Sequence, residues 1–234
     1  MVKTNESSDP IKNQYRAYLI LVVIVVGITL ILSLSSNSYF SRFLGEMNPL
    51  AVMLLSGFLG FLFLSFLLSQ GFSIYSGTNL LNAIRYSWWM VLFPLIAILV
   101  DYLMVFPQDM NILFPESLLF YPAIAFFVEI AFHVMPFVLL FYGLTTLFRK
   151  ISHNKISWFC VGMVAILEPT FQVYFMQTDP VWARIIVWIN LYLFNWTQLV
   201  VFTKFDFISM YALRILYYLI WHIIWGSLRL EILF

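Results

Sequence analysis

Apolar residues in this chain form long, nearly uninterrupted runs, and polar residues are confined to short stretches between them. A helix that crosses a bilayer needs roughly 20 apolar residues. Seven runs have about this length: Tyr18–Ser35, Leu50–Ser69, Trp88–Phe106, Leu118–Phe148, Ile156–Phe175, Val181–Phe202 and Phe207–Trp225. The pattern predicts an all-α, polytopic membrane protein with seven transmembrane helices.

The fourth run is longer than a single crossing requires, and it contains Pro122 and Pro136. Proline removes a backbone donor and kinks a helix, so we expect a break in this span. A short or re-entrant segment around Ile112–Phe120 would raise the number of helices to eight. The first run is not followed by the small-residue cleavage pattern of a secretory signal, and we expect it to be retained as a helix.

Composition supports a lipid environment: 63% of the 234 residues are hydrophobic and only 10% are charged, with a net charge of +1. Soluble domains are usually about 45–50% apolar and about 25% charged. A globule of this size cannot hide so much apolar surface from water. These values exclude a soluble enzyme, and the near-zero charge excludes a nucleic-acid partner. The single cysteine, Cys160, excludes a disulfide scaffold.

Lysine and arginine positions predict a cytoplasmic N-terminus and a multi-pass protein of the cell membrane. This orientation places eight basic residues inside: Lys3, Lys12, Arg16, Arg85, Arg149, Lys150, Lys155 and Lys204. It places three outside: Arg42, Arg184 and Arg229. We expect residues 1–16 to form a polar cytoplasmic segment and residues 17–234 to form a single transmembrane domain in contact with membrane lipids.

Six ionisable residues lie well inside the predicted spans: Asp101, Glu129, His133, Glu168, Arg214 and His222. Each costs about 2.5–3.5 kcal/mol at mid-bilayer, so such residues face the interior of the bundle and have partners. Glu129 and His133 are four residues apart and share one helix face. The sixth span adds the amides Asn190, Asn195 and Gln198.

Two glutamates and two histidines could hold Zn²⁺, with Glu129, His133, Glu168 and His222 as ligands and an open position for water. The same groups could activate water without a metal, with a glutamate as the general base. Structural interpretations stay open beside these. Glu129–His133 could be a pair that locks helices together, and Asp101–Arg214 could be a structural salt bridge.

The order and spacing of these residues resemble the CAAX protease and bacteriocin-processing family of intramembrane proteases (CPBP, also called Abi). Its first motif, Glu-Glu-x-x-x-Arg, corresponds here to Val128 through His133. Its second motif, Phe-x-x-x-His, corresponds to Val164 through Glu168, and its third, His-x-x-x-Asn/Asp, to His222 through Gly226. The resemblance covers roughly residues 118–226 and implies a CPBP-like core.

Several motif positions depart from the family. Val128 replaces the glutamate thought to activate water, and His133 replaces the arginine. Glu168 replaces the second-motif histidine and resembles the PrsW-type branch, which has a glutamate there. His222 alone matches the CPBP pattern outright. The resemblance implies catalytic roles for Glu129, Glu168 and His222.

These observations lead to three expectations of function. The first is an intramembrane peptidase that acts on a membrane-embedded protein or peptide. The second is a catalytically inactive scaffold or immunity-type protein, which would bind another membrane protein through a groove of small residues such as Gly57 and Gly60. A transporter is the third, but the chain lacks the internal repeat that is common in transporters.

Overall fold

The computed structural model describes residues 10–35, 38–77, 79–176 and 180–234, and these residues are helices joined by turns and loops. Seven helical segments are long and apolar enough to cross a membrane: Ile11–Ser35, Pro49–Ser69, Asn79–Met104, Ser117–Leu147, His153–Phe175, Val181–Lys204 and Phe207–Leu233. The predicted multi-pass, all-α class with seven spans is therefore confirmed.

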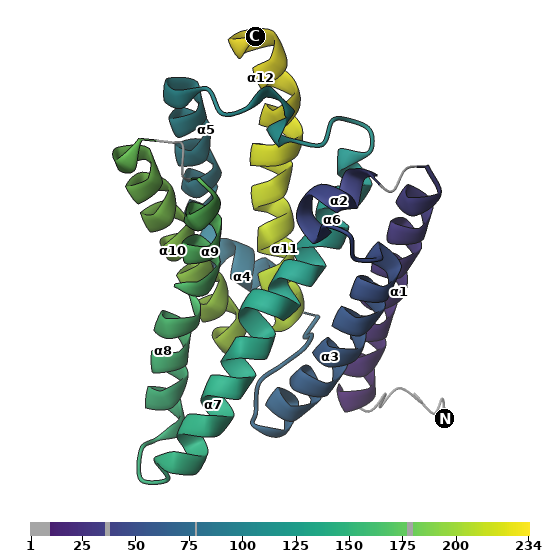
Figure 1. The fold of residues 1–234 in the computed structure, drawn as a ribbon. Helices are drawn as coiled ribbons and strands as arrows, with labels where there is room; N and C mark the ends of the chain where they lie inside the picture. Colours follow the sequence, from purple (N-terminus) through teal and green to yellow (C-terminus); the bar gives the residue numbers. More distant parts are fainter. Residues whose placement is uncertain (1–9, 36–37, 78, 177–179) are drawn as a thin grey trace, which may run out of the picture.

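Figure 1 shows the arrangement of these helices. The first half comprises α1 (Pro10–Ser35), α2 (Ser38–Leu44), α3 (Pro49–Ser69), α4 (Asn79–Ser87), η1 (Trp88–Val91), α5 (Leu92–Met104) and η2 (Gln108–Met110). The second half comprises α6 (Ser117–Val128), η3 (Glu129–Val134), α7 (Met135–Leu147), α8 (His153–Val164), α9 (Leu167–Phe175), α10 (Val181–Lys204), α11 (Phe207–Tyr218), η4 (Leu219–Trp225) and α12 (Gly226–Leu233). The start of α1 and the end of α12 lie at opposite ends of the bundle, as an odd number of spans requires.

The boundaries differ from the prediction at two places. The first helix begins at Pro10, so part of the expected polar segment 1–16 is helical, while residues 1–9, including Lys3, lie outside the described residues. An eighth helix at Ile112–Phe120 is wrong, because only Ser117–Phe120 of this stretch is helical and it forms the first turn of α6. The backbone N–H of Ile112 donates to Tyr121 Oη at 3.0 Å instead.

The long fourth span changes its helical geometry instead of breaking. Its middle, η3, is a π-helical segment that continues directly from α6 and into α7. Pro136, the second residue of α7, cannot donate to the preceding turn, which loosens the hydrogen-bond ladder there. Wide turns of this type insert an extra residue and are frequent at functional sites. Glu129 and His133 both belong to η3.

Helix α1 packs against α3 through glycine. The Tyr18 hydroxyl donates to the carbonyl of Gly57 at 2.9 Å. A Cβ atom at Gly60 would lie 2.1 Å from Tyr18 Oη and 2.7 Å from Ile130 Cδ1, so only glycine permits this approach. Both glycines are buried by the protein's own helices. The small-residue surface expected for a docking partner is therefore already covered.

Candidate functional site: a buried Glu–His–Arg network

Six polar side chains meet in the interior, at the junction of four helical elements. They are Glu129 and His133 of η3, Glu168 of α9, Asn195 and Gln198 of α10, and Arg214 of α11. Glu168 is 3% exposed, Arg214 is 1% exposed and the other four are fully buried. These contacts join residues that are up to 85 positions apart in the sequence. Three of the four predicted ligands are thus brought together.

Arg214 lies between the two glutamates. Its Nε donates to Glu129 Oε1 at 2.5 Å. Its Nη1 and Nη2 donate to the two oxygens of Glu168 at 3.0 and 2.9 Å, a bidentate pair. The planar guanidinium suits such paired acceptors, and its charge compensates carboxylates that would be costly to bury alone. The predicted Asp101–Arg214 salt bridge is therefore wrong, because Arg214 is committed to Glu129 and Glu168.

His133 lies between the same two carboxylates. Its Nδ1 is 3.0 Å from Glu129 Oε2, and its Nε2 is 3.7 Å from Glu168 Oε2. Arg214 Nη2 approaches Nδ1 at 3.5 Å. The predicted placement of Glu129 and His133 on one helix face is confirmed.

Amide side chains fix the orientation of the charged groups. Gln198 Nε2 donates to Glu129 Oε1 at 2.9 Å, and its Oε1 accepts from Arg214 Nη2 at 2.8 Å. Asn195 Oδ1 also accepts from Arg214 Nη2, at 3.2 Å. Gln172, one turn after Glu168, donates to Glu168 Oε1 at 2.9 Å. The sequence marked Asn195 and Gln198 only as polar residues in an apolar run, and it gave no indication of Gln172.

Two buried atoms of this network, His133 Nε2 and Asn195 Nδ2, make no hydrogen bond, and Glu129 Oε2 has only His133 Nδ1 as a partner, at 3.0 Å. Buried polar groups are usually fully paired, so these three atoms have hydrogen-bonding capacity to spare. They comprise a carboxylate acceptor, an imidazole nitrogen and an amide donor. Groups of this kind can hold a water molecule or a carbonyl group.

His222 lies in a different cluster. Its Nδ1 is 2.7 Å from Asn111 Oδ1, and its ring stacks on that of Tyr121 with centroids 4.5 Å apart. No hydrogen bond or ion pair within the described ranges joins His222 to the network around Arg214. The structure therefore does not bring the four predicted ligands together. Within those same ranges, no group of three or more His, Cys, Asp or Glu side chains is arranged to hold a metal ion.

A second buried ion pair joins α5 to α12. Arg229 Nε and Nη2 donate to the two oxygens of Asp101 at 2.6 and 2.8 Å. The indole of Trp225 donates to Asp101 Oδ2 at 2.6 Å. Arg229 also donates to the carbonyl of Phe106 at 2.6 Å. Arg229, expected on the outer side beyond the last span, is instead fully buried, and the pair has the character of a structural clamp.

Comparison of the chain with protein-family models, with curated proteins and with solved structures found no match. The site is therefore interpreted from its own geometry.

Proposed function

We propose that this protein is an intramembrane hydrolase, most simply a peptidase with a CPBP- or PrsW-like core, and that Glu129 is its general base. The observation that carries the proposal is the spare hydrogen-bonding capacity of three buried atoms, Glu129 Oε2, His133 Nε2 and Asn195 Nδ2. Buried groups with spare capacity are what a site needs to bind water and a substrate carbonyl.

The chemistry assigns one role to each group. Glu129 Oε2 takes a proton from water as the water oxygen bonds to the carbonyl carbon of the peptide. Asn195 Nδ2 donates to the carbonyl oxygen, where negative charge develops. The C–N bond then breaks, and the proton passes to the leaving nitrogen. Arg214 and Gln198 position Glu129 through its other oxygen, Oε1.

Access to a site this deeply buried requires one helix to move, and α9 is the candidate. A turn at residues 165–166 separates it from α8, and it carries Glu168 into the network. The last turn of α9 has exposed aromatic side chains: Tyr174 is 67% exposed and Phe175 is 68% exposed. We propose that a membrane-embedded substrate enters from lipid beside α9. The ion pair between Glu168 and Arg214 would then hold α9 in its closed position.

A second candidate function, the inactive scaffold, is favoured by the pairing of both glutamates with Arg214. In that case the network only joins four helical elements. Its expected docking surface at Gly57 and Gly60 is buried, so the partner would have to bind elsewhere. The two candidates differ in whether loss of the Glu129 charge removes a reaction or only lowers stability.

The test compares the protein N-termini in membranes of cells producing the wild type, Glu129→Gln or Glu46→Gln. Glu46 is exposed and far from the network in sequence, so Glu46→Gln is the matched control. The proposal expects new N-termini, within membrane-spanning segments of other proteins, with the wild type and Glu46→Gln but not with Glu129→Gln. Identical sets of N-termini in all three, with the variants folded, would instead support the scaffold.

A further inference from the structure

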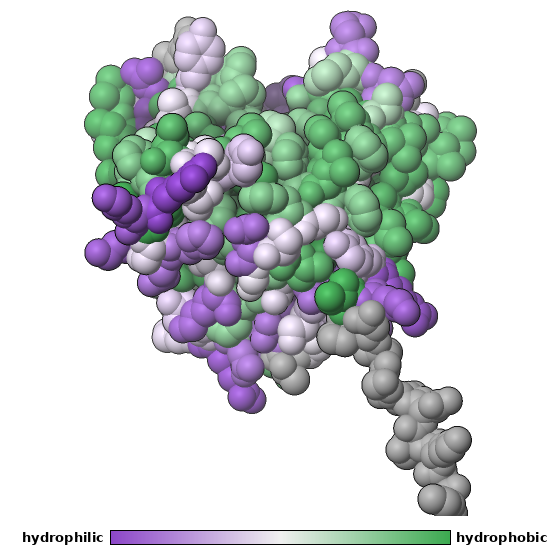
Figure 2. Space-filling model, turned by 90° about the horizontal axis from the view of Figure 1, so that it is seen from below, coloured by the Kyte–Doolittle hydropathy of each residue, from purple (hydrophilic) through white to green (hydrophobic). Residues whose placement is uncertain are grey.

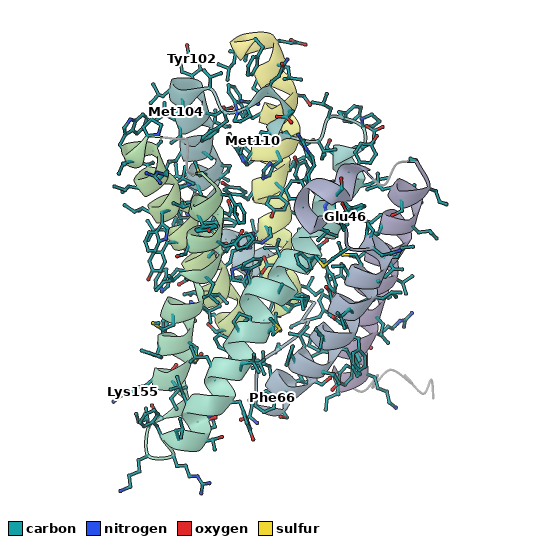
Figure 3. The ribbon with its side chains drawn as sticks, viewed as in Figure 1. Glu46, Phe66, Tyr102, Met104, Met110 and Lys155 are labelled. Atoms are coloured by element: carbon teal, nitrogen blue, oxygen red, sulfur yellow. The ribbon has the colours of Figure 1, made fainter. Side chains whose placement is uncertain are left out.

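The end of the bundle that carries the α7–α8 loop is basic. Its charged residues in the described ranges include seven cations: Lys12, Arg16, Arg85, Arg149, Lys150, Lys155 and Lys204. Figure 2 looks onto this end, where hydrophilic side chains gather beside hydrophobic surface, and Figure 3 places Lys155 there. The one described carboxylate at this end, Asp206, is buried and accepts from the N–H groups of Ser209 and Ser76. Among the described residues, cations therefore far outnumber carboxylates at this end.

A cavity of about 460 Å³ opens at this end, between α7, α8, α10, α4 and the turn after α3. Its polar wall includes Gln70, His153, Asn154, Ser157, Thr203 and Lys204. Its apolar wall includes Phe72, Phe141, Trp158 and Val200. Trp158 is 49% exposed, so one wall of the cavity reaches the outer surface of the bundle.

Lys204 provides the positive charge of the cavity. Its Nζ lies 3.9 Å from the centroid of the Tyr86 ring and 5.7 Å from that of Phe205. No carboxylate in the described ranges forms an ion pair with it. An ammonium group held over an aromatic ring keeps its charge available to an anion. The polar side chains of Asn154 and Ser157, on the first turns of α8, border the same space.

We propose that this cavity binds a phosphate group, carried by the headgroup of an anionic phospholipid, with Lys204 as its counter-ion. Basic pockets between transmembrane helices commonly take such headgroups. Asn154 and Ser157 would donate to the phosphate oxygens, and the first acyl carbons would contact Phe141 and Trp158. Free inorganic phosphate shares the recognised chemistry, but it would leave the apolar wall of the cavity unfilled.

The experiment measures the melting temperature of the purified protein in a neutral detergent during titration with phosphatidylglycerol. Phosphatidylcholine with the same acyl chains and inorganic phosphate serve as the other two arms. The proposal expects stabilisation by phosphatidylglycerol and not by phosphatidylcholine. Stabilisation by phosphate alone, at the same site, would confirm the phosphate chemistry but assign it to a soluble source.

Variants locate the effect. Lys204→Gln should raise the phosphatidylglycerol concentration for half-maximal stabilisation about fivefold, the effect of one basic group near a lipid surface. Lys150→Gln removes a charge from the same end without altering the cavity wall and should leave this concentration unchanged. Ser157→Leu, which fills the cavity and keeps every charge, should weaken binding like Lys204→Gln. Equal effects of the two lysine variants, with none from Ser157→Leu, would show diffuse attraction and overturn the proposal.

Discussion

At the scale of single residues, Arg214 holds the interior together, because it compensates two glutamates from different helices within 3.0 Å. The sequence identified it as an intramembrane charge and offered Asp101 as its partner, whereas the structure pairs it with Glu129 and Glu168. Which carboxylate faces Arg214 depends on how each helix is rotated about its own axis. The hydrophobic runs in this chain do not specify that rotation, because they are apolar on all sides.

Replacing Arg214 should therefore strongly destabilise the protein. Arg214→Met leaves Glu129 and Glu168 buried without a cation, and we expect a loss of about 3–5 kcal/mol in the free energy of unfolding. Arg85→Met removes an exposed arginine and should change the free energy little. Unfolding in a mixed-detergent titration measures both. Adding Glu129→Gln to Arg214→Met should recover part of the loss, and strictly additive losses would contradict the assigned contact.

The second ion pair allows a comparison of a buried with an exposed aspartate. Asp101→Ala leaves Arg229 buried without its counter-ion and should cost about 3–5 kcal/mol. Asp109 forms an ion pair with Arg42 but is 77% exposed, so Asp109→Ala should cost at most about 1 kcal/mol. Melting temperatures of the two variants test the ranking. Equal losses would show that Asp101–Arg229 is not the desolvated clamp described above.

At the scale of helical elements, the sequence predicted the seven spans because each is a continuous apolar run. It did not predict η3. Pro136 indicates only that a backbone hydrogen bond is missing, and either a kink or a π-helical turn is compatible with that loss. The sequence also placed His222 with Glu129, because both lie inside spans. The structure separates them, since His222 is two turns beyond Arg214 along the last span and pairs with Asn111.

The packing of α1 on α3 and η3 should depend on Gly60. In Gly60→Ala the new methyl group would overlap Tyr18 and Ile130, and we expect a destabilisation of about 1–3 kcal/mol. Gly27→Ala on α1 is the control, because no atom lies within 4 Å of a Cβ atom there. The same detergent titration reports both variants. A neutral Gly60→Ala would mean that α1 does not pack as described.

At the scale of the whole molecule, charge is distributed unequally between the two ends of the bundle, which predicts the orientation of the chain. Figure 3 places Lys155 at one end and Tyr102 and Met110 at the other. The basic end should therefore face the cytoplasm. The sequence predicted this arrangement, although Arg229, counted among the outer cations, lies inside the protein.

Labelling of single cysteines tests the orientation. The native Cys160 is buried and should not react with a membrane-impermeant maleimide added to intact cells. Glu46→Cys, near the outer end of α2 and α3, should be labelled, whereas Lys150→Cys should react only after the membrane is opened. Labelling of Lys150→Cys in intact cells would reverse the orientation and place the phosphate-binding cavity on the outer face.

The central claim is that Glu129 activates water for peptide hydrolysis, and oxygen isotope incorporation tests it most directly. The purified protein in lipid nanodiscs is incubated in ¹⁸O-labelled water with membrane proteins solubilised from the producing cells. Mass spectrometry then searches for newly formed C-termini. The account predicts C-termini that carry heavy oxygen with the wild type and with Glu46→Gln, and none with a folded Glu129→Gln. Heavy-oxygen termini that persist in Glu129→Gln, or that form with none of the proteins, would contradict it.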